Sequence, residues 1–240
     1  SNLALSSFSR TINQITETMK NLNKIFSSYY KFTLLTIVAL FSTNISYSQD
    51  FGADLVSSYV WRGTQFGSGS HIQPYMDLES GNLSGGVWGS FPTSAKGGGN
   101  ELDLWMSYDF GPLALTITNY TFPGEGGVYS KDEGLFNGDY TELSASTSIG
   151  GVDLSAGYFT EVEALYIELG TSIGAVDVAL GYGDDQSDPF YADGGSGLVN
   201  MSFSGSKDIQ ISDSYALPVF GSFIINPEAE TAFLVFGISF

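Results

Sequence analysis

Apolar residues alternate one by one with small or polar residues along most of the chain after residue 50. In residues 101–110, for example, Leu102 and Leu104 flank Asp103. Successive side chains of a β-strand point to opposite faces, so this period of two predicts strands with one apolar face and one polar face. No amphipathic helix is expected in residues 49–240, and this part of the chain is therefore predicted to be all-β.

The sequence predicts twelve strands joined alternately by short and long connections. The expected strands cover residues 51–65, 71–79, 83–91, 101–110, 113–122, 140–149, 152–160, 165–173, 176–183, 197–205, 209–222 and 231–240. The connections of two or three residues are expected at 80–82, 111–112, 150–151, 174–175 and 206–208. Short turns at one rim and long loops at the other are typical of outer-membrane barrels, whose even strand number returns both chain ends to the short-turn rim.

A membrane barrel and a soluble sandwich both alternate in this way, and the composition of the polar face separates them. A soluble surface usually carries many Lys and Glu residues, whereas the predicted strands are rich in Ser and Gly and contain one basic residue, Arg62. Strands in lipid must close into a ring, because no backbone edge can stay unpaired there. We predict a monomeric, transmembrane antiparallel β-barrel of about twelve strands. A secreted sandwich with its apolar faces packed together is the alternative.

The first 48 residues are predicted to be a targeting segment. An apolar run at 32–41 follows three lysines and precedes small residues that end at Ser48, which is the pattern of a secretory signal peptide. The run is shorter than the roughly 20 residues of a membrane-spanning helix. An amphipathic N-terminal helix is the alternative. We predict localisation to the outer membrane of a Gram-negative bacterium, with an upstream extension, a signal peptide and the barrel over 1–18, 19–48 and 49–240.

Charge and cysteine content exclude several classes of protein. The chain has 8 Lys and Arg against 26 Asp and Glu, a net charge of −18, and no Cys. This acidic balance argues against a nucleic-acid partner, which would need a basic face. The lack of Cys excludes a disulfide scaffold and a thiolate metal site.

Aromatic residues cluster near the ends of the predicted apolar faces. Two such girdles around an aliphatic band are expected where a barrel contacts the lipid of both membrane interfaces. The predicted girdle residues are Phe51, Tyr59, Trp61, Phe91, Tyr108, Phe110, Tyr158, Tyr182 and Phe240. The terminal strand ending at Phe240 resembles the assembly signal of outer-membrane barrels, and this resemblance implies the barrel-assembly machinery as a partner.

Several segments resemble one family of bacterial barrels. The stretch DLVSSYVWRG at 54–63 is similar to the opening strand of the TorF-type porin family. Segments with the sequences IQP, GVWGS, LPVFG, NPE and GISF resemble other parts of that family, at 72–74, 86–90, 217–221, 226–228 and 237–240. Residues 123–196 match in pattern alone. The resemblance implies an outer-membrane barrel that lets small solutes pass passively, and it specifies no solute.

The inward faces are predicted to carry one cation among many carboxylates. By strand parity Arg62 faces the lumen, where it would be either a constriction charge or half of a structural ion pair. Rings of carboxylates favour cations, so a modest cation preference is expected. Inward aromatic residues could also fill the lumen, and a non-conducting structural or adhesive barrel is the alternative. The predicted pore-lining residues besides Arg62 are Glu101, Asp103, Glu142, Glu168, Asp54, Asp109, Asp153, Asp177 and Trp105.

Two further patterns are candidate reactive or metal-binding sites. His71 follows Ser68 and Ser70, which is similar to an outer-membrane phospholipase, but a catalytic triad needs its members in contact and this spacing does not require it. An acidic loop contains Asp184 and Asp185, but it lacks the twelve-residue spacing of a calcium loop. We therefore expect no enzyme activity, no metal and no cofactor, with a lipase as the weaker alternative.

Overall fold

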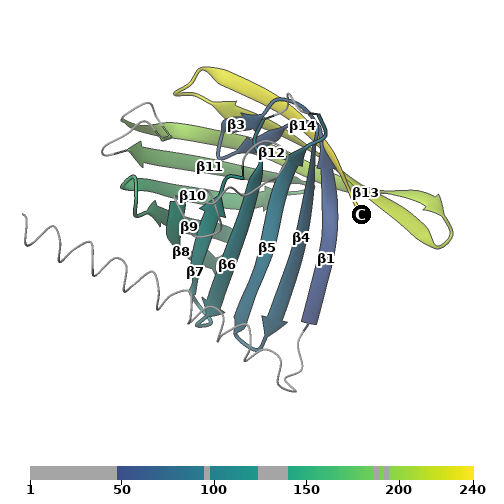
Figure 1. Ribbon diagram of the computed structural model, residues 1–240, viewed down its shortest axis with the longest axis horizontal. Helices are drawn as coiled ribbons and strands as arrows, with labels where there is room; N and C mark the ends of the chain where they lie inside the picture. Colours follow the sequence, from purple (N-terminus) through teal and green to yellow (C-terminus); the bar gives the residue numbers. More distant parts are fainter. Residues whose placement is uncertain (1–47, 95–97, 124–139, 186–189, 192–194) are drawn as a thin grey trace, which may run out of the picture. The chain divides into compact units, whose positions relative to one another are not determined.

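The computed structural model describes residues 48–94, 98–123, 140–185, 190–191 and 195–240. Twelve strands form one barrel (Figure 1): β1 (Ser48–Val56), β4 (His71–Ser80), β5 (Leu83–Pro92), β6 (Glu101–Asp109), β7 (Ala114–Thr121), β8 (Tyr140–Ile149), β9 (Val152–Phe159), β10 (Ala164–Ile173), β11 (Val176–Asp185), β12 (Ser196–Ser212), β13 (Tyr215–Asn226) and β14 (Thr231–Ser239). A separate hairpin consists of β2 (Tyr59–Trp61) and β3 (Thr64–Gly67). The predicted extension 1–18 and the predicted signal peptide, apart from Ser48, lie outside the described residues.

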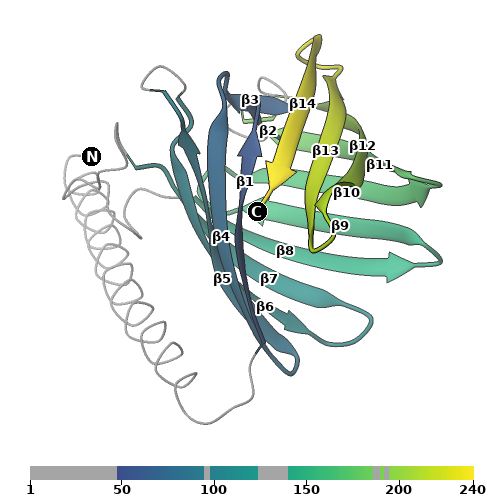
Figure 2. The same ribbon diagram turned by 90° about the vertical axis from the view of Figure 1, so that its right-hand side faces the viewer.

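The barrel strands form a closed antiparallel ring. Each strand pairs with its neighbours in the chain, and β1 pairs with both β4 and β14, which closes the ring. Figure 2 shows β1 and β14 side by side at this closure. The prediction of an all-β, twelve-stranded antiparallel barrel is confirmed, and the packed sandwich is wrong. The described residues contain no helix that is long and apolar enough to cross a membrane.

Connections of two to four residues lie at one end of the barrel, which we call the turn end. They follow β4, β6, β8, β10 and β12, and the opposite end, where the connections have four residues or more, is called the loop end. Gly150 and Gly151 have φ angles of 62° and 83° in one of these turns. Positive φ at both central residues is what a type I′ hairpin turn requires, and the twist of this turn matches that of the strands.

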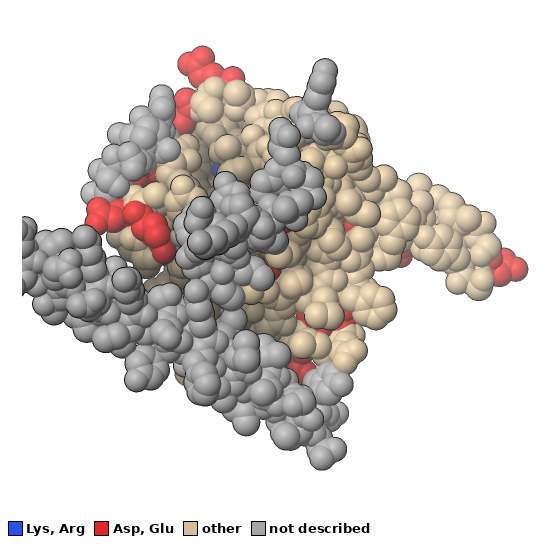
Figure 3. Space-filling view, in the orientation of Figure 1, with Lys and Arg blue, Asp and Glu red and all other residues tan. Residues whose placement is uncertain are grey.

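The apolar face of the strands points out of the ring. Phe51, Ile149 and Ile173 are exposed by 76%, 73% and 67% of their surfaces. Most of the described surface seen in Figure 3 belongs to residues without charge. The inward face carries carboxylates, Ser and Gly, and Glu101 and Glu142 are buried there. The barrel is therefore apolar outside and polar inside, which is the reverse of a soluble protein.

Two predicted strand boundaries are wrong. The strand expected over 51–65 ends at Val56, and the chain then turns into the β2–β3 hairpin. The turn expected at 206–208 lies instead at 213–214, because β12 continues to Ser212 and pairs with β13 as far as Ser212 and Tyr215. The polar triplet that suggested a turn lies beyond the last pairing of β12 with β11, at Ser204, where this hairpin begins to project from the barrel (Figure 1). Its polar side chains can face water there without breaking the ladder.

The closure between β1 and β14 is the shortest ladder of the ring. β1 pairs with β4 along its whole length, but its register with β14 covers only 54–56. Backbone bonds between Ala53 and Phe240, and from the Ser57 amide to the Phe236 carbonyl, extend this seam slightly. Strand pairing joins residues 48–52 only to β4 and residues 215–218 only to β12 among the described strands.

The short seam is expected to open more readily than the rest of the wall. The amides of Ala53 and Ser57 donate across the seam at 3.4 and 2.8 Å, and the intervening Asp54 amide points the other way, toward β4. Local opening is easiest where few backbone bonds must break together. We expect the Ala53 and Ser57 amides to exchange hydrogen at least about tenfold faster than Asp54, as measured residue by residue by NMR. Equal protection of these amides would contradict a weak seam.

Candidate functional site

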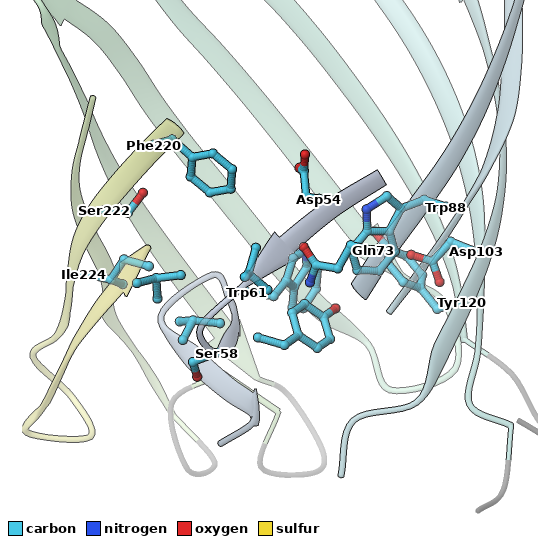
Figure 4. Close-up of a pocket in the computed structure, with 14 residues that line it drawn as sticks. Asp54, Ser58, Trp61, Gln73, Trp88, Asp103, Tyr120, Phe220, Ser222 and Ile224 are labelled. Carbon is cyan, nitrogen blue, oxygen red and sulfur yellow. The ribbon is translucent and has the colours of Figure 1, made fainter. Parts of the chain in front are cut away.

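The β2–β3 hairpin lies inside the ring, at its loop end. It pairs with no barrel strand, yet its residues contact side chains or backbone on many sides of the wall. Tyr59 bonds to Glu101 on β6, Arg62 bonds to Glu142 on β8, and the Asn226 amide of β13 donates to the Gly63 carbonyl at 3.2 Å. Contacts with strands that lie far apart around the ring place the hairpin across the lumen (Figure 4).

The turn of this hairpin is Arg62-Gly63, with φ angles of 47° and 79°. Trp61 and Thr64 pair on either side of it. Two-residue turns with positive φ at both positions usually have Asn or Asp before the Gly, because other side chains crowd the backbone in that region. Arg62 is therefore held in a strained conformation, and contacts of its side chain must offset that strain.

The Arg62 guanidinium is bound on several sides within the lumen. Its Nη2 lies 2.8 Å from Glu142 Oε1 in an ion pair, and its Nη1 donates to the Tyr191 hydroxyl at 2.6 Å. The guanidinium carbon lies 4.2 Å from the ring centres of both Trp61 and Tyr166. A planar guanidinium can bond in its plane and stack on both faces, which a Lys ammonium cannot do. Arg62 thus joins the hairpin to β8, β10 and the loop after β11.

Burial alone would lower the pKa of Arg62, but neighbouring groups, including the Glu142 carboxylate, raise its pKa above the usual value. The guanidinium therefore stays charged. Burial also raises the pKa of the Tyr191 phenol, which keeps that ring neutral beside the cation. The result is one permanent positive charge with a carboxylate partner at the centre of the loop end.

Three inward glutamates each accept a hydrogen bond from a tyrosine. Tyr59 donates to Glu101 at 2.7 Å and Tyr120 donates to Glu142 at 2.7 Å. Glu168 accepts from Tyr166 and from the Asn200 amide, the latter at 3.1 Å. Buried carboxylates need such donors, because an unbonded charge in this surrounding is costly. Strand parity predicted that the three glutamates face inward, but it did not predict their tyrosine partners.

An aromatic cluster packs around the hairpin and fills much of the loop end. Phe159, Tyr166, Tyr191 and Val199 are almost fully buried, and Trp61 packs against them. Trp61 lies 5.7 Å from the Tyr120 ring centre and 6.1 Å from that of Phe159. The prediction that inward aromatics could fill part of the lumen thus applies to this end.

Two cavities lie nearer the turn end. The first has a volume of about 380 Å³ and lies against the hairpin, between β1, β4, β6 and β13 (Figure 4). The second has a volume of about 520 Å³ and is lined by residues of β6 to β10, including Asp109, Asp153 and Glu168. The hairpin and its aromatic neighbours therefore crowd the loop end, where a smaller cavity of about 280 Å³ remains beside Trp61, Tyr120 and Phe159, and the lumen is hollow toward the turn end.

The predicted pore-lining residues separate into distinct places. Arg62 and Glu142 form the ion pair, and Glu101 lies beside Asp103 at the hairpin. Asp54 and Asp103 line the first cavity. Trp105 bonds to Asp77 in the lumen, and Asp177 accepts from the Ser172 hydroxyl at 2.6 Å near the turn end.

The predicted outer positions of Tyr59 and Trp61 are wrong. Tyr59 is only 5% exposed and Trp61 packs in the aromatic cluster. The chain leaves the barrel wall after Val56, so strand parity cannot be counted through to these residues. Six other predicted girdle residues are exposed, and Phe91 is partly exposed. The six are Phe51, Tyr108, Phe110, Tyr158, Tyr182 and Phe240.

The structure brings together neither of the weaker candidate sites. His71 is buried, its Nδ1 lies 3.0 Å from Ser90, and no described contact joins it to Ser68 or Ser70. Asp185 accepts hydrogen bonds from the backbone amides of Phe190 and Tyr191. The rest of the acidic loop lies largely outside the described residues. The described part of the chain holds no group of three potential metal ligands.

Comparison with known proteins finds several solved structures that are similar to this chain. No family model matches the chain, and no curated protein matches it. An anion-selective porin from Comamonas acidovorans is similar, with 14% sequence identity, a TM-score of 0.32, and coverage of 80% of this chain and 72% of that chain. A likeness of this size says nothing about the solutes or the charge preference of this chain.

Proposed function

We propose that the protein is an outer-membrane channel for small solutes, with the β2–β3 hairpin as its gate. The apolar outer face and the closed ring suit a bilayer, where every backbone group of the wall must be paired. The observation that carries the proposal is the hairpin itself, which crosses the lumen yet forms no ladder with the wall. Side-chain contacts around Arg62 hold it, so it can leave without breaking the barrel.

We propose further that the open channel prefers cations. Inward carboxylates line the hollow part of the lumen, including Asp54, Asp109 and Asp153. Among the described residues the basic side chains are Arg62, which is paired with Glu142, and Lys207, which lies in the projecting β12–β13 hairpin. A ring of carboxylates without a competing cation attracts cations and repels anions.

Planar-bilayer recording with a KCl gradient tests this function. We expect the reversal potential to show a cation preference, and the triple substitution D54N/D109N/D153N to reduce it by at least about half, because the fixed charge that attracts cations is removed. Asp213→Asn is the matched control, because Asp213 lies in the exposed β12–β13 turn. Anion preference of the wild-type protein would contradict the proposed selectivity.

A non-conducting structural barrel is the second candidate, and the aromatic packing at the loop end favours it. The gated channel and the structural barrel differ in whether the hairpin can move. A structural barrel should remain closed to ions even when the Arg62 contacts are removed, whereas the gated channel should then conduct more. Absence of conductance in both the wild-type protein and an Arg62→Ala variant would support the structural barrel.

A further inference from the structure

The first cavity has an apolar side that sets it apart from the rest of the lumen. Val56, Val60, Phe220, Ile224 and Val235 line it. Four of these residues belong to β1, β13 and β14, and Val60 is on the hairpin. Figure 4 shows Phe220 and Ile224 together on one side of the cavity. An inward apolar wall is unfavourable against water, so it indicates a ligand with an apolar part.

The opposite side of the same cavity is polar. Gln73, Trp88, Asp103 and Tyr120 lie together there (Figure 4), and Asp54 also lines the cavity. Asp103 is 7% exposed and its carboxyl shares a hydrogen bond with Glu101, while its Oδ1 atom is buried without a hydrogen-bond partner among the described residues. A buried oxygen without a partner is costly, and its place on a residue that lines a cavity indicates that the Asp103 carboxyl can take a donor from outside the chain.

We infer that this cavity binds a small organic ammonium ion with an apolar body. The ammonium is attracted by Asp54 and donates to the Asp103 carboxyl, while the hydrocarbon part contacts Phe220 and the neighbouring aliphatic side chains. A carboxylate ligand would meet the negative charge of Asp54 and that of the hydrogen-bonded Asp103 and Glu101 pair, and repulsion disfavours it. This inference names a solute class for the proposed channel and rests on it, but binding itself requires no conduction.

Binding of hexylammonium to the full chain in amphipol tests the inference, with calorimetry as the measurement. We expect saturable binding of hexylammonium, binding of methylammonium weaker by at least about tenfold because its apolar contacts are lost, and no binding of hexanoate. Fluorescence of Trp61 and Trp88, which line the cavity, should change on binding of hexylammonium and stay constant with hexanoate. Absence of hexylammonium binding, or equal binding of hexanoate, would overturn the inference.

Two substitutions locate the binding in this cavity. Asp103→Asn replaces the acceptor with an uncharged group and should weaken hexylammonium binding at least about tenfold, because hydrogen bonds to charged groups are the stronger ones. Phe220→Ser removes part of the apolar wall and should also weaken it. Phe223→Ser is the matched control on the same strand, since Phe223 is 44% exposed and should leave binding unchanged.

The outcomes separate this inference from the proposed channel. Hexylammonium binding that depends on Asp103 and Phe220, in a protein that never conducts, would keep the ligand site and overturn the channel. Conduction by a protein that does not bind hexylammonium would keep the channel and overturn the ligand site. Binding that neither substitution weakens would place the ligand outside this cavity and overturn the inference.

Discussion

Substituting Arg62 by Ala is expected to destabilise the barrel by about 3–5 kcal/mol, the range found when one partner of a buried ion pair is removed. Glu142 would lose its cation while 3% exposed, and Trp61 and Tyr166 would lose the guanidinium between them. Ala at this position would still have the steric cost of the positive φ angle, without the side-chain contacts that offset this cost for Arg62. Equilibrium unfolding in urea, from a refolded wild-type and variant protein, measures the loss.

The same substitution is expected to increase channel conductance. The hairpin forms no ladder with the wall, so removal of its central cation frees it to leave the lumen. Single-channel recording should show larger or more frequent openings than in the wild-type protein. A stability loss below about 1 kcal/mol, the value typical of an exposed ion pair, together with unchanged conductance, would mean that the aromatic cluster holds the hairpin without help from Arg62.

Two further variants separate the charge of Arg62 from its shape. Arg62→Lys keeps the charge but cannot stack and bond in one plane, so its stability should lie between those of the wild type and R62A. The double variant R62A/E142Q removes the unpaired carboxylate and should recover part of the stability lost in R62A. It should not close the channel again, because the contacts of Arg62 with Tyr166 and Tyr191 stay absent.

Alternation predicted the barrel well because the outer face of the wall is apolar along nearly every strand. The hairpin was missed because nothing after Val56 interrupts the pattern: Ser57-Ser58 is not a strong turn signal, and Tyr59 and Trp61 continue the period of two. One available signal was length. The predicted strand over 51–65 is longer than the 9–11 residues that a tilted strand needs to cross a bilayer.

The type of partner for Arg62 could be predicted, but not its identity. Strand parity placed both the cation and several carboxylates inside, so an ion pair was one of the two expectations for Arg62. Which of the inward carboxylates pairs with Arg62 depends on how far the hairpin reaches across the ring, and in the structure it is Glu142. The tyrosine contacts depend on strand register: Thr118 pairs with Glu142, which brings Tyr120, two residues on, within bonding distance. Alternation carries no information about register between strands.

Substituting Gly63 by Ala is expected to have the second large effect. Gly63 has a φ of 79°, and a Cβ atom there would overlap the backbone carbonyl oxygen of Val199 on β12. Backbone of a barrel strand cannot shift as a flexible side chain can, so the hairpin itself must move out of the lumen. We expect stability to fall by more than 2 kcal/mol, on the order of a severe steric or backbone conflict in a core, and conductance to rise as in R62A.

Gly151→Ala isolates the close approach from the cost of positive φ. Gly151 has a φ of 83°, and nothing lies within 4 Å of its would-be Cβ, so this substitution should cost only about 1–2 kcal/mol for the left-handed conformation and leave conductance unchanged. Equal losses in the two variants would show that Gly63 is required by the turn alone. A larger loss at Gly63, accompanied by higher conductance, would mean that the contact between hairpin backbone and wall backbone helps to keep the gate shut.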